Sequence, residues 1–147
     1  MTAPYLSPGL PAPAPLPDGL DGAYWEGTRA HELRVQSCQA CGACQWGPEW
    51  LCHRCLSFDT GWKTLSGRGR IYSWERVWHP VHPALADHGP YIVALVTLDD
   101  ADDARMIGNL IGDPQQPVQI GAPVEAVYED HDEGKPPYTL VHWRVTT

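Results

Sequence analysis

The hydrophobic and polar positions of this chain change their pattern at residue 67. Beyond that point, apolar residues come in short runs, and segments rich in Gly, Pro and Asp separate the runs. The pattern predicts five β-strands, at residues 70–78, 91–98, 105–111, 123–129 and 138–145. Because no long helical stretch lies between them, these strands favour a small closed barrel over an α/β sheet. The fold class is therefore predicted as mainly β.

The predicted strand at 70–78 shows alternation most clearly. It should place Ile71, Ser73, Glu75 and Val77 on one face, and Tyr72, Trp74, Arg76 and Trp78 on the other. The dense apolar run at 91–98 suits a central strand.

Residues 24–35 show helical spacing instead. One face of a short amphipathic helix would carry Tyr24, Trp25, Thr28, His31, Glu32 and Val35. The aromatic side chains are too large for so small an element to bury alone, so we expect this helix to dock on something.

Residues 1–23 hold six of the fifteen prolines and no charge before Asp18. Since proline lacks the amide donor and disfavours helix at the preceding residue, they predict an extended tail. A disordered leader is favoured; the alternative is a strap along a partner, burying Tyr5, Leu6, Leu10, Leu16 and Leu20. The predicted organisation is a tail at 1–23, a helix and cysteine-rich segment at 24–66, and a barrel at 67–147.

The cysteines form two Cys-x-x-Cys pairs, Cys38/Cys41 and Cys52/Cys55, with ten residues between them. Structural zinc takes four such ligands at tetrahedral corners, and each turn presents two thiolates while backbone amides bond the sulfurs. Gly42 supplies the permissive backbone that a knuckle needs. A duplicated pair is a strong signal. It predicts a closed, structural zinc site that performs no chemistry.

Cys44 complicates this assignment, because Cys41 and Cys44 also have Cys-x-x-Cys spacing. A redox pair would leave the other cysteines unexplained, so a spare thiol is favoured. His53 lies between two ligands, which disfavours it as a replacement for a thiolate.

The net charge and the positions of the basic residues bear on which ligands the protein can bind. The formal net charge of -8 argues against broad contact with nucleic acid or an anionic membrane. Half of the ten basic residues nevertheless fall in one central stretch that can receive a phosphorylated ligand: Arg54, Lys63, Arg68, Arg70 and Arg76. No apolar run suits a secretory signal or a membrane span. A cytoplasmic location is expected, where clustered cysteines are metal ligands rather than disulfides.

Motifs of self-sufficient enzymes are missing: there is no phosphate-binding loop, nucleophile elbow or zinc-protease helix motif. His79, His82 and His88 lie beside prolines after the first barrel strand, with no carboxylate at a helical offset. A polar loop is favoured there over an acid–base site. The acidic runs at 99–103 and 129–133 are interpreted as solvated turns rather than calcium sites.

Several short motifs occur in a fixed order between residues 24 and 146. They are Tyr24-Trp25, Cys38-x-x-Cys41-Gly42, Pro48, Cys52-x-x-Cys55, Gly67-x-Gly69-x-Ile71-Tyr72-Ser73-Trp74, the run from Gly89 to Val96, the run from Gly108 to Gly112, Ile120-Gly121-x-Pro123-Val124-Glu125 and Glu129-Asp130. In combination this pattern resembles the DUF35 family, in which a rubredoxin-like zinc ribbon precedes a five-stranded OB-fold barrel. Leu56, where many relatives carry glycine, and the extra Cys44 depart from it, but neither removes a ligand.

Members of the family pair with thiolase-superfamily enzymes or with hydratases that act on acyl-CoA substrates. The resemblance implies a non-catalytic, zinc-binding accessory subunit in a hetero-oligomer, and a thiolase-superfamily acyl-CoA enzyme is the favoured partner. The helix and ribbon would dock to the partner, through Tyr24, Trp25 and His31. The barrel would bind or cover the coenzyme A end of the thioester. The candidate contacts to coenzyme A are basic, aromatic and loop residues: Arg68, Arg70, Trp78, His79, His82, Tyr91 and Asn109.

The His-Pro loop and the run from Tyr138 to Trp143 resemble a subgroup that accompanies lipid-transfer-protein-like thiolases in steroid-degrading bacteria. That likeness implies retro-aldol cleavage of steroid side-chain 3-hydroxyacyl-CoA thioesters by the partner.

Two rival functions stay open. An OB barrel can bind single-stranded nucleic acid on aromatic platforms in a positive groove, although the acidic balance opposes this. A stand-alone redox or hydrolytic enzyme would use Cys44 or the histidines.

Overall fold

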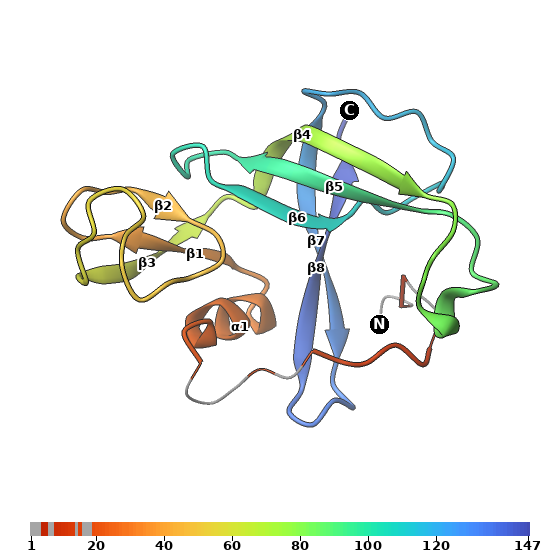
Figure 1. The fold of residues 1–147 in the computed structure, drawn as a ribbon, viewed down its shortest axis with the longest axis horizontal. Coiled ribbons are helices and arrows are strands. Elements are labelled where there is room, and N and C mark those ends of the chain that lie inside the picture. The colour runs from red at the N-terminus through yellow and green to blue at the C-terminus, as the bar shows by residue number, and fades with distance from the viewer. Residues whose placement is uncertain (1–3, 6–7, 14, 16–18) are drawn as a thin grey trace.

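The computed structural model describes residues 4–5, 8–13, 15 and 19–147. In these residues one short helix precedes two antiparallel sheets (Figure 1). After α1 (Gly22–Arg29), the smaller sheet has the order β2-β1-β3 and consists of β1 (Leu33–Cys38), β2 (Cys44–Gln45) and β3 (Thr60–Leu65). The larger has the order β6-β5-β4-β7-β8 and consists of β4 (Arg68–Val77), β5 (Tyr91–Leu98), β6 (Arg105–Asn109), β7 (Pro123–His131) and β8 (Tyr138–Val145). A 3-10 turn, η1 (Pro83–Leu85), lies between β4 and β5.

The larger sheet closes on itself between its two edge strands. Leu110, just after β6, forms a parallel bridge with Trp143 of β8, and the Ile111 amide donates to the Trp143 carbonyl at 2.8 Å. Alternate residues of every strand fill the interior, among them Ile92, Met106 and Val124. The mainly β fold class and the five-stranded OB-fold barrel are confirmed.

The small sheet shares this core. Leu33 and Val35 of β1, Cys44 of β2 and Leu65 of β3 belong to the same buried cluster as the barrel interior. At the far end of the small sheet, a separate cluster contains only Cys38, Ala43 and Cys52. The cysteine-rich end therefore has almost no apolar core of its own.

The helix predicted at 24–35 is wrong in its second half. α1 ends at Arg29, His31 takes a left-handed backbone with φ 56°, and Leu33 begins β1. Pairing with β3 from Leu33 to Cys38 decides this, because burying Leu33 and Val35 against the barrel requires an extended chain. β3 itself went unrecognised in the sequence, where little periodicity is visible.

The predicted assignment of side chains to the two faces of 70–78 is also wrong beyond Ile71. A bulge between Ile71 and Ser73 leaves Tyr72 without a partner on β5. Since one extra residue reverses the facing of every later side chain, Trp74 packs against the core and Ser73 is exposed.

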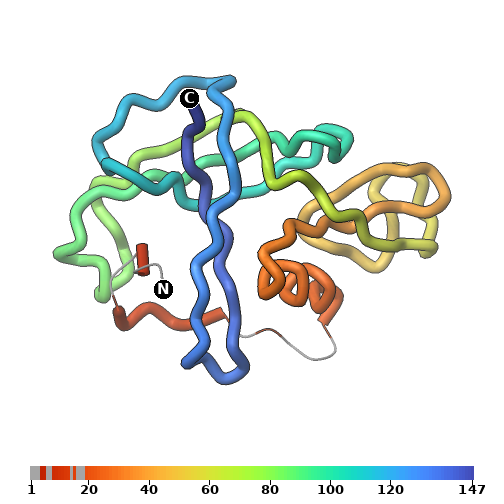
Figure 2. Tube along the Cα trace, turned by 180° about the vertical axis from the view of Figure 1, so that it is seen from behind, coloured from red at the N-terminus to blue at the C-terminus, as the bar shows by residue number. Residues whose placement is uncertain are grey.

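The described part of the proline-rich segment runs beside the β7–β8 ribbon, as Figure 2 shows from behind. Leu6 and Leu16, named as residues that a strap would bury, lie outside the described residues. Among the described residues, no helix has the length and apolar character needed to cross a membrane.

Candidate metal centre and neighbouring sites

Four cysteines meet at the end of the small sheet. The sulfurs of Cys38, Cys41, Cys52 and Cys55 all lie within 4.8 Å of one another. The Sγ atoms of Cys38 and Cys55 are 3.6 Å apart, as are those of Cys41 and Cys52. The ligands therefore pair across the two turns, and the four residues can hold a metal ion.

The two turns have matching backbones. The Gly42 amide donates to the Cys38 carbonyl at 2.9 Å, and the Leu56 amide donates to the Cys52 carbonyl at 3.0 Å. Both residues have a left-handed backbone, with φ 76° at Gly42 and 62° at Leu56. Amide groups of Cys55 and Arg54 donate toward the Cys52 sulfur and lower the pKa of that thiol to about 6. The turn thus favours a thiolate at Cys52, whereas burial and the neighbouring sulfurs raise the pKa of Cys55.

Leu56 occupies a position that suits glycine. A side chain in the left-handed region costs about 1–2 kcal/mol, and the greater unfolded-state entropy of glycine cancels part of the gain on replacement. We expect Leu56→Gly to raise the free energy of unfolding of the metal-loaded chain by about 1 kcal/mol, measured by thermal denaturation. Leu56→Ala removes the same exposed side chain but keeps Cβ, so it should lie within about 0.5 kcal/mol of wild type. A glycine variant no more stable than the alanine variant would contradict the assigned backbone strain.

The second turn is tied to the barrel. Arg54, between two of the ligands, pairs with Asp102, and Lys63 of β3 donates to the Asp100 carbonyl. Both acceptors lie in the β5–β6 turn, where Asp100, Asp102 and Asp103 have left-handed backbones. The acidic run at 99–103 is a turn, and it also holds the cysteine-rich end against the barrel.

Cys44 and His53 stand apart from the four sulfurs. Cys44 lies in the barrel core, and burial raises the pKa of its thiol, which disfavours redox or nucleophilic chemistry. His53 Nδ1 lies 2.7 Å from Gln45 Oε1, and Gln45 in turn donates to Gln36. His53 is itself exposed and contacts the edge of a buried amide pair, Gln36 and Gln45.

The three partner-binding candidates meet different surroundings. Tyr24 packs on the core beside Trp25 and Trp46, and burial raises the pKa of its phenol. Together with Trp62 and Pro48, these aromatics line an apolar groove of about 270 Å³ between α1 and the small sheet.

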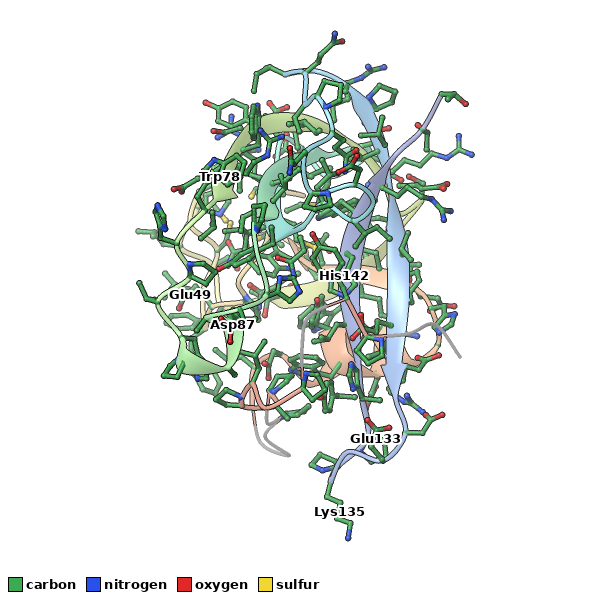
Figure 3. All side chains as sticks on the ribbon, turned by 90° about the vertical axis from the view of Figure 1, so that its right-hand side faces the viewer. Glu49, Trp78, Asp87, Glu133, Lys135 and His142 are labelled. Carbon is green, nitrogen blue, oxygen red and sulfur yellow. The ribbon has the colours of Figure 1, made fainter. Side chains whose placement is uncertain are left out.

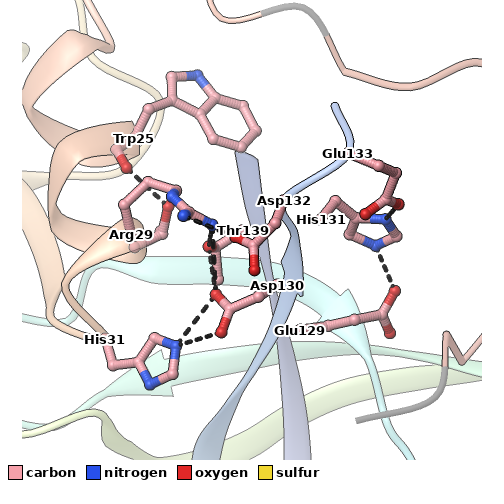
Figure 4. A network of polar contacts seen from close by, with 10 residues as sticks. Trp25, Arg29, His31, Glu129, Asp130, His131, Asp132, Glu133 and Thr139 are labelled. Carbon is pink, nitrogen blue, oxygen red and sulfur yellow. Dashed lines mark hydrogen bonds and ion pairs between the residues drawn. The ribbon is translucent and has the colours of Figure 1, made fainter. Parts of the chain in front are cut away.

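His31 instead faces β7. Its ring stacks on Tyr128 at 4.9 Å, and its Nε2 lies 3.0 Å from Asp130. Arg29 reaches Asp132 at 2.8 Å from the same end of the helix, and Thr139 donates to Asp130 (Figure 4). The Thr139 hydroxyl, with His31 and Arg29, holds the pKa of Asp130 below its usual range. These contacts fix α1 to the barrel.

The seven coenzyme A candidates do not form one site. Arg68 and Arg70 line a cavity of about 320 Å³ with Asp99 and Glu125. Trp78 follows the other end of β4. At 3.3 Å per residue, it lies about 25 Å from Arg70 along the strand.

The candidates near Trp78 have local roles. The exposed Trp78 ring lies beside the Arg76 guanidinium, and Tyr91 opens β5 opposite Val77. His82 caps η1 by accepting from the Ala84 amide, and His79 lies exposed in the preceding loop. Asn109 lines a third cavity, beside β7 and β8.

A buried cluster in that third region was not predicted from the sequence. The interpretation of Glu129 as part of a solvated turn is wrong, because Glu129 lies in β7 and is only 4% exposed. His131 Nε2 lies 2.6 Å from one carboxylate oxygen, and His142 Nε2 lies 2.9 Å from the other. Burial alone would raise the pKa of Glu129, but hydrogen bonds from the Tyr5 amide, His131 and His142 lower it. The Glu-x-His spacing on one strand face was the available signal.

Comparisons with known proteins bear on both parts of the chain. The family model described as the C-terminal OB-fold domain of ChsH2 matches residues 62–129. A probable enoyl-CoA hydratase alpha subunit of Thermomonospora curvata is 36% identical over 125 residues, 84% of this chain and 37% of that protein. A 3-oxo-4,17-pregnadiene-20-carboxyl-CoA hydratase alpha subunit of Mycobacterium tuberculosis is 32% identical over 148 residues, 90% of this chain and 44% of that protein. The chain thus spans less than half the length of these two relatives.

Two further matches cover most of the other protein. A DUF35 domain-containing scaffold protein of Methanocaldococcus jannaschii is 30% identical over 104 residues, 66% of this chain and 70% of that protein. A chain from the structure of an Ltp2-ChsH2(DUF35) aldolase superposes with a TM-score of 0.74 at 32% identity, covering 92% of this chain and all of that one.

Proposed function

This chain belongs to the DUF35 family, and from that premise we propose that it is a non-catalytic, zinc-binding accessory subunit of a thiolase-superfamily acyl-CoA enzyme. The observation that carries the proposal is the match over 92% of this chain to a chain of an Ltp2-ChsH2(DUF35) aldolase. By the same likeness, the proposed reaction of the complex is retro-aldol cleavage of steroid side-chain 3-hydroxyacyl-CoA thioesters.

The metal ion of the site is proposed to be zinc. Four thiolates at about 2.3 Å from a tetrahedral zinc lie about 3.8 Å from one another; two of the sulfur pairs here are 3.6 Å apart, and all pairs lie within 4.8 Å. Cys38, Cys41, Cys52 and Cys55 would hold the ion with no open coordination position. When bound, the metal supplies folding energy to the turns and no catalytic chemistry.

The docking surface is proposed to lie on the cysteine-rich end and α1. Trp50, Leu56 and Phe58 are exposed there, at 68%, 65% and 78%. The groove between α1 and the small sheet adds Trp25 and Trp46. Exposed aromatic side chains beside an apolar groove are typical of a protein interface.

The phosphates of coenzyme A are proposed to bind at Arg68 and Arg70. Both side chains are exposed, and neither is in an ion pair among the described residues. The neighbouring Glu125 is already neutralised by Arg144 at 2.6 Å. Arg70 Nη1 donates to the Gly121 carbonyl at 3.2 Å, and the other donors of the two guanidinium groups can form charge-assisted hydrogen bonds to phosphate.

Purification of the tagged chain from its native host tests the partner. A thiolase-superfamily protein should copurify in stoichiometric amount, and the complex, but not the isolated chain, should cleave a steroid 3-hydroxyacyl-CoA. Recovery of the chain alone, or retro-aldol activity of the chain without a partner, would overturn the proposal.

Substitution of both arginines tests the coenzyme A contact. In the purified complex, Arg68→Ala with Arg70→Ala is expected to weaken coenzyme A binding about tenfold, or ~1.4 kcal/mol, measured by calorimetry. Lys135→Ala removes an exposed cation in the β7–β8 turn, which does not line the cavity of Arg68 and Arg70, and should change the affinity less than twofold. Equal losses in both variants would mean that only general charge matters.

Single-stranded nucleic-acid binding is a second candidate because of one surface feature. The Arg105 guanidinium lies 3.8 Å from the ring centre of the exposed Tyr72, on the outside of the barrel. Strongly salt-dependent binding to an oligonucleotide, lost in Tyr72→Ala, would support it. The net charge of -8 opposes it.

A further inference from the structure

A cavity of about 400 Å³ lies between the β7–β8 ribbon, the end of β6 and the N-terminal segment. We call the described residues 4–5 and 8–13 the strap. Asn109, Glu129, Leu140 and His142 line the cavity on the barrel side, and Pro4 and residues 8–13 line it on the other. The volume falls within the range of about 300–1,000 Å³ that is usual for small-molecule sites. Figure 3 shows His142 in the middle of the molecule, well away from Lys135 at the tip of the ribbon.

Tyr5 of the strap meets the buried polar groups. Its amide donates to Glu129 Oε2 at 2.9 Å, its hydroxyl donates to the Leu110 carbonyl at 3.3 Å, and its ring lies 5.5 Å from that of His142. Tyr5 thus presents two neutral donors and a flat apolar ring to this region. Among the described strap residues, these two hydrogen bonds and the ring contact join Tyr5 to the barrel.

The barrel side presents acceptors. The hydrogen bonds to Glu129 keep this carboxylate ionised, so it accepts from His142 Nε2 at 2.9 Å. In the neutral imidazole, a proton on Nε2 leaves a lone pair on Nδ1. His142 is 4% exposed, and its Nδ1 has no partner among the described residues. A buried acceptor without a donor is uncommon, and it indicates a group that completes the site.

The charged residues that line the cavity further restrict which ligands it can bind. Glu129 and Glu133 both line the cavity, and the histidines that hydrogen-bond to Glu129 are directed at its two oxygens. Among the described lining residues there is no Lys or Arg. A phosphate or carboxylate would be repelled, whereas amide N–H and hydroxyl groups find acceptors.

We propose that this cavity binds a neutral organic chain carrying amide N–H or hydroxyl donors, and that the strap is its lid, with Tyr5 standing in for the ligand. The ligand displaces Tyr5, donates to Glu129 Oε2 in place of the Tyr5 amide, and supplies the donor that His142 Nδ1 lacks. The inference does not depend on the proposed function, since it uses only contacts within this chain.

The test compares two probes that share a ring and differ in charge. N-acetyltyrosinamide is neutral and carries the donors of Tyr5, whereas N-acetyltyrosine bears a carboxylate. Binding is followed through the imidazole nitrogen signals of His131 and His142 in the ¹⁵N-labelled full chain. In Tyr5→Ala, the neutral probe is expected to shift both signals saturably, at least fivefold more tightly than in wild type and at least tenfold more tightly than the anionic probe.

Tyr72→Ala is the matched control, because it removes an exposed tyrosine from the outside of the barrel and should respond as wild type does. Tyr5→Phe, which loses only the hydroxyl, is expected to fall between wild type and Tyr5→Ala. The absence of a saturable shift in Tyr5→Ala would overturn the proposal. An equal response to both probes would do so too, as it would show that the acceptors do not select the ligand.

Discussion

Replacement of Cys38 by serine is expected to release the bound metal and unfold the two cysteine turns. The buried cluster there contains only Cys38, Ala43 and Cys52, so apolar packing contributes little to the stability of the turns. Structural zinc sites contribute apparent free energies of about 10–16 kcal/mol in small domains. Cys55→Ser should act in the same way, because each Sγ lies 3.6 Å from its partner across the site. The checks are zinc per chain by mass spectrometry and the protection of amides at 38–58 from hydrogen exchange.

The loss should be local. Leu33, Val35 and Leu65 attach the small sheet to the barrel core, so the barrel should keep its hydrogen-exchange protection in Cys38→Ser. Partner binding should nevertheless disappear if the proposed docking surface is right, since Trp50, Leu56 and Phe58 lie on the turns. Cys44→Ala, which changes the core cysteine, is the control and should retain one zinc per chain. Full zinc content in Cys38→Ser would show that the ligand assignment is wrong.

Replacement of Trp143 by alanine should have the largest effect on the barrel itself. The side chain is fully buried, and its residue joins β8 to the end of β6 through the bridge that closes the barrel. Gly108 lies directly against the indole: a Cβ at that glycine would stand 2.9 Å from two ring atoms. Because the ring fills a space that its neighbours cannot close, the expected loss is about 3–5 kcal/mol of unfolding free energy. Denaturant unfolding of the metal-loaded chain measures it.

Trp50→Ala is the matched control for this change. Trp50 is 68% exposed, so its removal should alter the unfolding free energy by about 0.5 kcal/mol or less. If Trp143→Ala cost no more than Trp50→Ala, packing of the Trp143 indole would not be a main source of the barrel's stability.

The sequence by itself predicted the features that depend on local spacing. The two Cys-x-x-Cys turns require only short segments of chain, and the backbone at Gly42 follows from the turn it makes. The strands at 91–98 and 138–145 were predicted with the bounds that β5 and β8 have, because runs so rich in apolar residues are stable only within a sheet.

The tertiary structure decided what depends on partners distant in the chain. Pairing with β3 makes the segment predicted as the end of the helix a strand, β1. The bulge at Tyr72 places Trp74 on the core side of β4. Glu129 became a buried acceptor only because His142 and Tyr5, 13 and 124 residues away, supply its donors. Periodicity predicts which face of a strand or helix is buried. Which strands become neighbours in a sheet depends on packing between residues that are distant in the chain, and a local pattern does not contain that information.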